Sequence, residues 1–101
     1  MAIARGATIS NTFTVPVDLT TAVAMYVTYQ QGGRTVLEKN LADCEITATT
    51  ITVDLSQEET LKFIENKAVK IQIRAKLPDG SAHKSNIIET TADELLKEGV
   101  I

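Results

Sequence analysis

Residues 67–77 alternate strictly between apolar and polar side chains, and this period of two constrains the fold more than any other feature of the chain. The apolar row contains Val69, Ile71, Ile73, Ala75 and Leu77, and the polar row contains Lys70, Gln72, Arg74 and Lys76. A β-strand sends successive side chains to opposite faces, whereas a helix would mix the two rows. The segment is therefore predicted to be a strand with one buried face and one solvated face.

Weaker versions of this pattern, rich in Thr, Val and Ile, predict further short strands. They cover residues 8–15, 22–30, 34–39, 43–48, 50–55 and 81–91. The first is predicted to bury Ile9, Asn11, Phe13 and Val15, and the second Val23, Met25, Val27 and Tyr29. Glycine adopts the positive φ angles of tight turns, so the turns at 31–33 and 78–81 predict antiparallel hairpins.

Two short helices are predicted from capping boxes, in which a Ser or Thr side chain and a Glu side chain three residues later each bind the other's backbone amide. Ser56 with Glu59 is expected to open one or two helical turns through Lys62, with Leu61 and either Phe63 or Ile64 facing inward. A second helix is expected over residues 91–98, opened by Thr91 with Glu94 and ended by Gly99.

Six or seven short strands, with a helical turn before the strand at 67–77, are typical of a β-sandwich. We therefore predict a mostly-β chain that folds as one antiparallel, Ig-like sandwich domain over residues 1–101, with one or two short helices. The strand at 67–77 does not begin with the tyrosine of a tyrosine corner, and the chain has no Cys–Trp–Cys core. Membership of the true immunoglobulin family is accordingly not predicted.

Charge and hydropathy argue against nucleic acid and membranes as partners. The chain has 10 basic and 13 acidic residues and a net charge of −3, whereas nucleic-acid-binding modules usually carry a basic excess. No segment approaches the 18 apolar residues of a membrane span, and residues 1–6 have no apolar stretch of signal-peptide length. We expect neither membrane insertion nor export by a visible signal.

Candidate catalytic residues are few. Cys44 is the only cysteine and His83 the only histidine, so a Ser-His-Asp or Cys-His system would have to use them, and zinc would lack the three or four ligands that it needs. The neighbours Glu58 and Glu59 point about 100° apart on a helix and are better explained as favourable charges at its N-terminus. We expect no enzyme, no metal and no cofactor.

The polar row of the strand at 67–77 is the candidate site for a partner. Lys70, Gln72, Arg74 and Lys76 would form a basic stripe that an acidic protein surface could contact. The alternative is a solvated strand face whose charges are balanced by Glu or Asp on neighbouring strands.

Several segments resemble short proteins encoded among phage and prophage structural genes of Gram-positive bacteria. They are MAIARGAT at 1–8, FTVP at 13–16, VTYQQGG at 27–33 leading to VLEK at 36–39, LSQEETLKF at 55–63 and VKIQIR at 69–74. The resemblance implies a non-catalytic structural or assembly protein of the tail or baseplate. Such a protein would bind other phage structural proteins, form homo-oligomers of undetermined order, and reside in the virion or the host cytoplasm.

Two other functions remain open from the sequence. A small ligand-binding module for cell-wall carbohydrate or peptide would need a concave face with exposed aromatic rings. A small hydrolase would need His83 close to Cys44 or to a carboxylate in a pocket.

Overall fold

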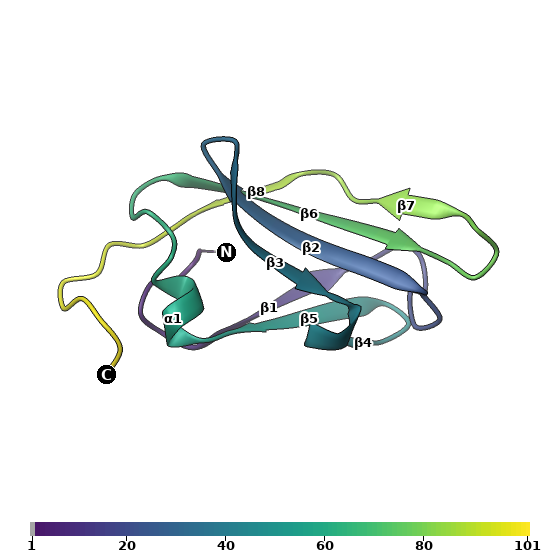
Figure 1. Cartoon of the computed structure of the whole chain (residues 1–101), viewed down its shortest axis with the longest axis horizontal. Helices are drawn as coiled ribbons and strands as arrows, with labels where there is room; N and C mark the ends of the chain where they lie inside the picture. Colours follow the sequence, from purple (N-terminus) through teal and green to yellow (C-terminus); the bar gives the residue numbers. More distant parts are fainter. Residues whose placement is uncertain (1) are drawn as a thin grey trace.

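The computed structural model describes residues 2–101 and arranges eight strands there in two antiparallel sheets (Figure 1). The smaller sheet has the order β1-β5-β4 and consists of β1 (Ile9–Thr14), β4 (Cys44–Ile46) and β5 (Thr50–Leu55). The larger sheet has the order β3-β2-β6, and both β7 and β8 pair with the far side of β6. Its strands are β2 (Ala24–Gln31), β3 (Arg34–Asn40), β6 (Ala68–Lys76), β7 (Ala82–Lys84) and β8 (Ile88–Thr91).

This strand order is that of an Ig-like sandwich. In immunoglobulin domains strands B, E and D share one sheet, and C, F and G share the other, where C′ joins them. Here β1, β5 and β4 take the places of B, E and D, while β3, β2, β6 and the β7–β8 pair take those of C′, C, F and G. Two short helical elements connect strands, namely the 3-10 turn η1 (Leu41–Asp43) and α1 (Gln57–Thr60). The predicted mostly-β, antiparallel, Ig-like sandwich is confirmed.

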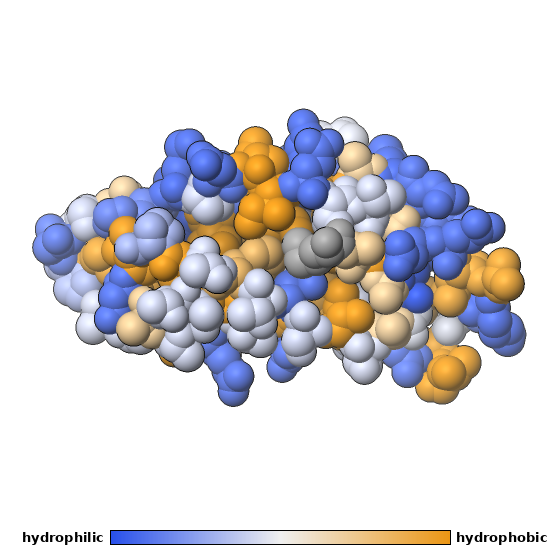
Figure 2. All heavy atoms as spheres, turned by 180° about the vertical axis from the view of Figure 1, so that it is seen from behind, coloured by the Kyte–Doolittle hydropathy of each residue, from blue (hydrophilic) through white to orange (hydrophobic). Residues whose placement is uncertain are grey.

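The core lies between the two sheets, and β6 supplies its centre. The apolar row of β6 is buried from Val69 to Ala75, as the alternation predicted. The inner faces of β2 and β5 contribute Met25, Val27, Tyr29, Ile51, Val53 and Leu55 to the same core. Seen from behind (Figure 2), polar side chains cover most of the surface and hydrophobic ones show between them. Burial of one row of β6 fixes its polar row on the outside.

A buried polar contact joins the two sheets, a role that a disulfide has in antibody domains. The Tyr29 hydroxyl on β2 donates a hydrogen bond of 2.8 Å to Oδ1 of Asn11 on β1. The ring of Tyr29 meets Phe63 edge-on, with centroids 5.9 Å apart. Burial raises the pKa of the Tyr29 hydroxyl, so this group stays protonated and continues to donate. Asn11 lies on the inner face, as the sequence predicted.

The tight turns have the chemistry expected of them. Gly32 and Gly33 have φ angles of 58° and 78° and close the hairpin between β2 and β3, and Gly80, with φ of 88°, lies in the turn between β6 and β7. The predicted capping box of Ser56 and Glu59 is present at the start of α1. Local chemistry therefore sets both hairpins and this helix start.

The second predicted helix, over residues 91–98, is wrong, because this segment forms no helix. Thr91 belongs to β8, and Ala92 forms a parallel bridge with Ile3. The amide of Ile3 donates to the carbonyl of Thr91 (3.0 Å), and the amide of Asp93 donates to the carbonyl of Ile3 (2.9 Å). Strand pairing thus holds the backbone extended where the capping box would begin.

Two details of the strands also differ from the prediction. Val23, predicted on the inner face, is 58% exposed. The amide of Ala22 donates a hydrogen bond to the carbonyl of Leu19 (3.1 Å), and this turn places Ala22 in the inner position instead. The strand predicted at 81–91 is divided into β7 and β8. Ser85 interrupts it, since its hydroxyl accepts from the amide of Ile73 (3.0 Å) where a backbone carbonyl would otherwise bind.

The Tyr29→Phe variant tests the contact between the sheets. Removing the hydroxyl deletes one buried hydrogen bond and keeps the ring, so the free energy of unfolding should fall by about 1 kcal/mol. Denaturant unfolding followed by circular dichroism measures the change. Tyr26→Phe, on an exposed ring, is the matched control and should change the value by less than about 0.5 kcal/mol. Equal effects of the two substitutions would contradict the role given to this hydroxyl.

Candidate functional site

The polar row of β6 points outward from the larger sheet, and the register identifies its neighbours. The outward pairs are Tyr26–Arg74, Thr28–Gln72 and Gln30–Lys70 on the β2 side, and Lys84–Arg74 and Glu89–Lys70 on the β7–β8 side. We call the surface formed by Tyr26, Lys70, Arg74, Lys76 and Lys84 the basic face. It brings together three of the four predicted contact residues and two residues that the sequence did not single out.

Gln72, the fourth predicted contact residue, serves the fold. Its side-chain amide donates to the carbonyl of Ser85 (3.2 Å), the residue that separates β7 from β8. This bond helps to hold the interrupted edge of the sheet in place. Partner contact at Lys70, Gln72, Arg74 and Lys76 stays a prediction.

The cations of the basic face have few acidic neighbours. No ion pair within residues 2–101 involves this face. Glu89 lies opposite Lys70, but Arg74 lies opposite Lys84, and like charges in that arrangement destabilise a sheet. Glu89 on the neighbouring strand can therefore balance the charge of Lys70. The other cations of the basic face have no acidic residue opposite them on the paired strands.

Tyr26 adds an aromatic ring to the basic face. It is 48% exposed and lies opposite Arg74, and Tyr and Arg are the residue types that contribute most often to binding hot spots. The other three aromatic side chains, Phe13, Tyr29 and Phe63, are buried in the core. Within the described chain, Tyr26 is thus the one ring available for stacking, which is less than a carbohydrate platform normally presents.

Two residues of the basic face escaped the sequence reasoning for different reasons. Lys84 could have been found by counting residues outward from the turn at 78–81 along both strands, since that hairpin fixes the pairing of β6 with β7. Tyr26 could not, because β2 and β6 are far apart in the sequence and no local signal sets their register.

The structure does not bring Cys44 and His83 together. Cys44 lies on β4, an edge strand of the smaller sheet, and His83 lies on β7 in the larger sheet. Burial raises the pKa of the Cys44 thiol, and the nearby Asp43 raises it further, which disfavours the reactive thiolate. This arrangement offers no activated nucleophile at Cys44.

His83 does have a hydroxyl and a carboxylate near it, but in an order unsuited to catalysis. Its Nε2 lies 3.2 Å from the Ser81 hydroxyl, which donates to Oδ1 of Asp79 (2.6 Å). Hydrogen bonds from Ser81 hold the pKa of Asp79 below its usual value. A nucleophilic triad needs the histidine between serine and carboxylate, whereas here the serine is in the middle. The contacts stabilise the β6–β7 turn.

Among residues 2–101, no group of three or more His, Cys, Asp or Glu side chains is placed to hold a metal ion. Over the same residues, none of the helices has the length and apolar character that crossing a bilayer requires.

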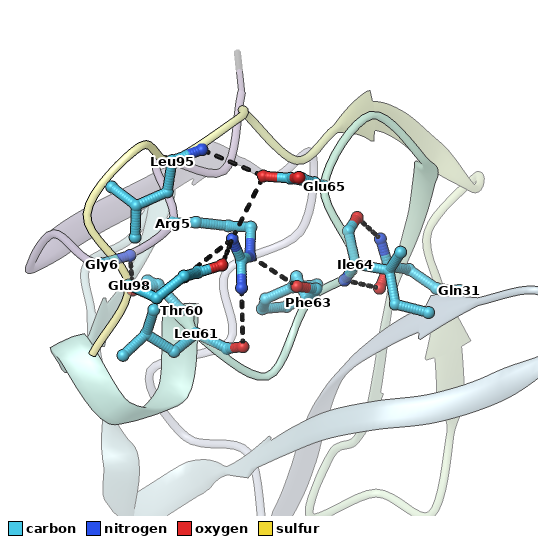
Figure 3. Close-up of polar contacts among 10 residues, drawn as sticks. All are labelled: Arg5, Gly6, Gln31, Thr60, Leu61, Phe63, Ile64, Glu65, Leu95 and Glu98. Atoms are coloured by element: carbon cyan, nitrogen blue, oxygen red, sulfur yellow. Dashed lines mark hydrogen bonds and ion pairs between the residues drawn. The ribbon is translucent and has the colours of Figure 1, made fainter. Parts of the chain in front are cut away.

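A polar cluster that the sequence did not predict surrounds Arg5 (Figure 3). Its guanidinium donates to the backbone carbonyls of Phe63 (2.7 Å) and Leu61 (3.4 Å) and pairs with the carboxylates of Glu98 (2.9 Å) and Glu65 (3.4 Å). These contacts join the N-terminal segment, the α1–β6 connection and the C-terminal segment. The Arg5 side chain is nearly buried among these partners, as expected of a group that stabilises the fold.

Gln31 also binds the connection between α1 and β6, on the side away from Arg5 (Figure 3). Its buried amide donates to the carbonyls of Ile64 (2.9 Å) and Lys67 (3.3 Å), and its side-chain oxygen accepts from the amide of Ile64 (2.8 Å). A tyrosine corner binds backbone in the same part of an immunoglobulin domain. Gln31 and Arg5 take over that function here.

Comparison with known proteins adds little to this description. No family model and no curated protein matches the chain. Among solved structures, it is similar to the Ig-like domain of mouse leukocyte-associated immunoglobulin-like receptor 1, solved as a strand-swapped dimer. The two sequences are 14% identical over 93% of this chain and 88% of the other, and the TM-score is 0.49. It is also similar to the V domain of amphioxus IgVJ-C2, with 8% identity over 93% and 100% of the two chains and a TM-score of 0.37. Similarities this distant carry no functional argument.

Alkylation of Cys44 tests the low reactivity of its thiol. Because the pKa is raised, the thiolate fraction at about pH 8 is smaller than in a free cysteine. Iodoacetamide should therefore modify the native protein several-fold more slowly than the protein in concentrated denaturant. The native rate should also keep rising as the pH passes the ordinary thiol pKa. Mass spectrometry over time measures both rates, and faster modification of the native protein would show an activated thiol instead.

Proposed function

We propose that this chain is a non-catalytic structural or assembly protein of a phage or prophage particle, in the tail or baseplate. It acts by binding other particle proteins through the basic face. The alternative of a carbohydrate-binding module has less support, because Tyr26 is the one exposed ring in the described chain.

The observation that carries this proposal is the separation of charge on the molecule. The chain as a whole is acidic, with a net charge of −3, yet four cations gather on the outer face of β6 and β7. Placing Arg74 opposite Lys84 costs stability in the isolated protein. An acidic partner surface would relieve that repulsion, and complementary charge also speeds association and selects the partner.

The assignment to a phage particle rests on the resemblance of the sequence to short phage structural proteins. The fold is compatible with it, since a sandwich with flat faces and open strand edges can bind proteins without special residue types. The partners we propose are the tail or baseplate proteins encoded beside its gene, and they should present acidic surfaces.

Arg74→Glu tests the basic face. The substitution turns the repulsive pair with Lys84 into an attractive one, so the protein should fold at least as well as the wild type. Its affinity for the purified tail and baseplate proteins encoded next to its gene should fall by about tenfold or more, with a weaker dependence on salt. Isothermal titration calorimetry at two salt concentrations measures both effects.

Lys62→Glu is the matched control. It makes the same change of net charge at an exposed position after α1, away from the basic face, so binding should stay within about twofold of the wild type. Equal losses in the two variants would show a general charge effect and contradict a site at Arg74. If none of the neighbouring particle proteins bound the wild-type protein, the proposed function itself would be wrong.

A further inference from the structure

Among residues 2–101, no strand pairs with the outer edge of β1. β1 pairs with β5 on one side only, and upstream of β1 Ile3 bridges Ala92, the residue after β8. The amide of Val15 donates to the carbonyl of Thr49 (2.8 Å), which fixes the alternation of the ladder. The amides and carbonyls of Ser10, Thr12 and Thr14 therefore point away from β5, in position to pair with an added strand.

An apolar groove lies near this edge, between the two sheets. Val15, Val17 and Leu19 line it from the segment after β1, Ile73 and Ala75 from β6, and Lys84 stands among the β7 residues at its rim. Its volume of about 140 Å³ is close to that of an engineered cavity, roughly 150 Å³, which accepts benzene. The groove can therefore take apolar side chains that an added strand directs inward.

The last nine residues, 93–101, form what we call the C-terminal arm, which has no helix or strand of its own. Leu96 is 94% and Ile101 92% exposed, and Val100 is exposed as well. In Figure 2 a group of hydrophobic side chains lies at the end of the molecule that carries the arm. Apolar side chains this exposed gain free energy when a second surface covers them.

Asp93, through the hydrogen bond from its amide to Ile3, and the half-buried Leu95 anchor the start of the arm, and from Leu96 onward the arm is held mainly by polar contacts at the surface. Glu98 pairs with Arg5 (2.9 Å), the amide of Leu95 donates to Glu65 (3.1 Å), and the amide of Ile101 donates to Gln57 (2.9 Å). Glu98 is 59% exposed, so solvent screens its side of the pair. Arg5 is nearly buried, but it keeps Phe63, Leu61 and Glu65 as partners when the arm leaves. Releasing this part of the arm therefore costs little of the free energy of folding.

The arm and the groove complement each other in shape and charge. On an extended strand Leu96, Glu98 and Val100 share one face, so two apolar side chains flank one carboxylate. The apolar pair suits the groove, and the carboxylate suits Lys84 at its rim. The arm as a whole carries three acidic side chains and one basic one.

We propose that the C-terminal arm of one copy adds as an extended strand to the β1 edge of a second copy, with Leu96 and Val100 seated in the groove. The arm and β7, which lines the groove with His83 and Lys84, lie toward opposite ends of the long axis (Figure 1). The contact therefore joins two different surfaces and leaves a free edge at one end of the assembly and a free arm at the other, which produces chains or closed rings of copies. This inference does not depend on the proposed function and shares only Lys84 with the basic face.

Two variants of the full chain separate donor from acceptor. Leu96→Ser with Val100→Ser disables the arm at exposed positions, and Val17→Lys places a charge in the groove. The mass of the wild type, measured by sedimentation velocity over a concentration series, should increase with concentration, whereas each variant alone should remain monomeric. An equimolar mixture of the two should form dimers and nothing larger, because one functional arm meets one functional edge.

A control variant and the exchange rates of two β1 amides accompany the mass measurement. Val23→Ser with Ile64→Ser removes two exposed apolar side chains elsewhere and should associate as the wild type does. Thermal unfolding checks that every variant is folded, and in assembled wild type the amides of Thr12 and Thr14 should exchange at least about tenfold more slowly with solvent.

Three results would overturn the proposal. They are a wild type that is monomeric at every concentration, oligomers that persist in either variant, and a variant mixture that stays monomeric. Slow exchange of the two amides that does not depend on concentration would show instead that the arm covers the edge of its own molecule.

Discussion

The pleat of β6 makes the core and the candidate binding surface depend on each other. Because side chains alternate along a strand, the side chains between the buried Val69, Ile71 and Ile73 must point outward. A shift of one residue against β2 would carry Lys70 and Arg74 into the core, at the cost of burying unpaired charge. The packing that stabilises the sandwich therefore also holds cations side by side on its outer face.

Much of the fold was predictable because its signals are local. Alternation identified the strands, and glycine turns identified the hairpins, each within a window of about ten residues. The errors arose where a distant segment decided the outcome. Residues 91–98 carry a valid helix-start signal, yet pairing with Ile3 keeps them extended, and no pattern near Thr91 could have revealed that partner. For the same reason the place of Tyr26 beside Arg74 became visible only in the structure.

The absence of a tyrosine corner was read correctly from the sequence, but its replacement could not be. Arg5 and Gln31 reach the same turn from segments 58 and 33 residues away. Both bind backbone groups of this turn, which every residue carries and which therefore leave no trace in composition or spacing. An arginine and a glutamine can satisfy the carbonyls of this corner as well as a phenol can, because all three present N–H or O–H donors. The Ig-like architecture constrains where a donor is needed and leaves its chemical type open.

The bridge between Ile3 and Ala92 gives the sandwich an almost circular path. When the segments near the two ends of a chain pair in this way, the fold depends little on where the chain is opened, and exposed turns are the places where an opening is tolerated. A permuted gene that opens the loop around Asp79 and links the original ends would encode the same two sheets. It would also tether the arm at both ends, so the architecture would survive while the arm lost its reach.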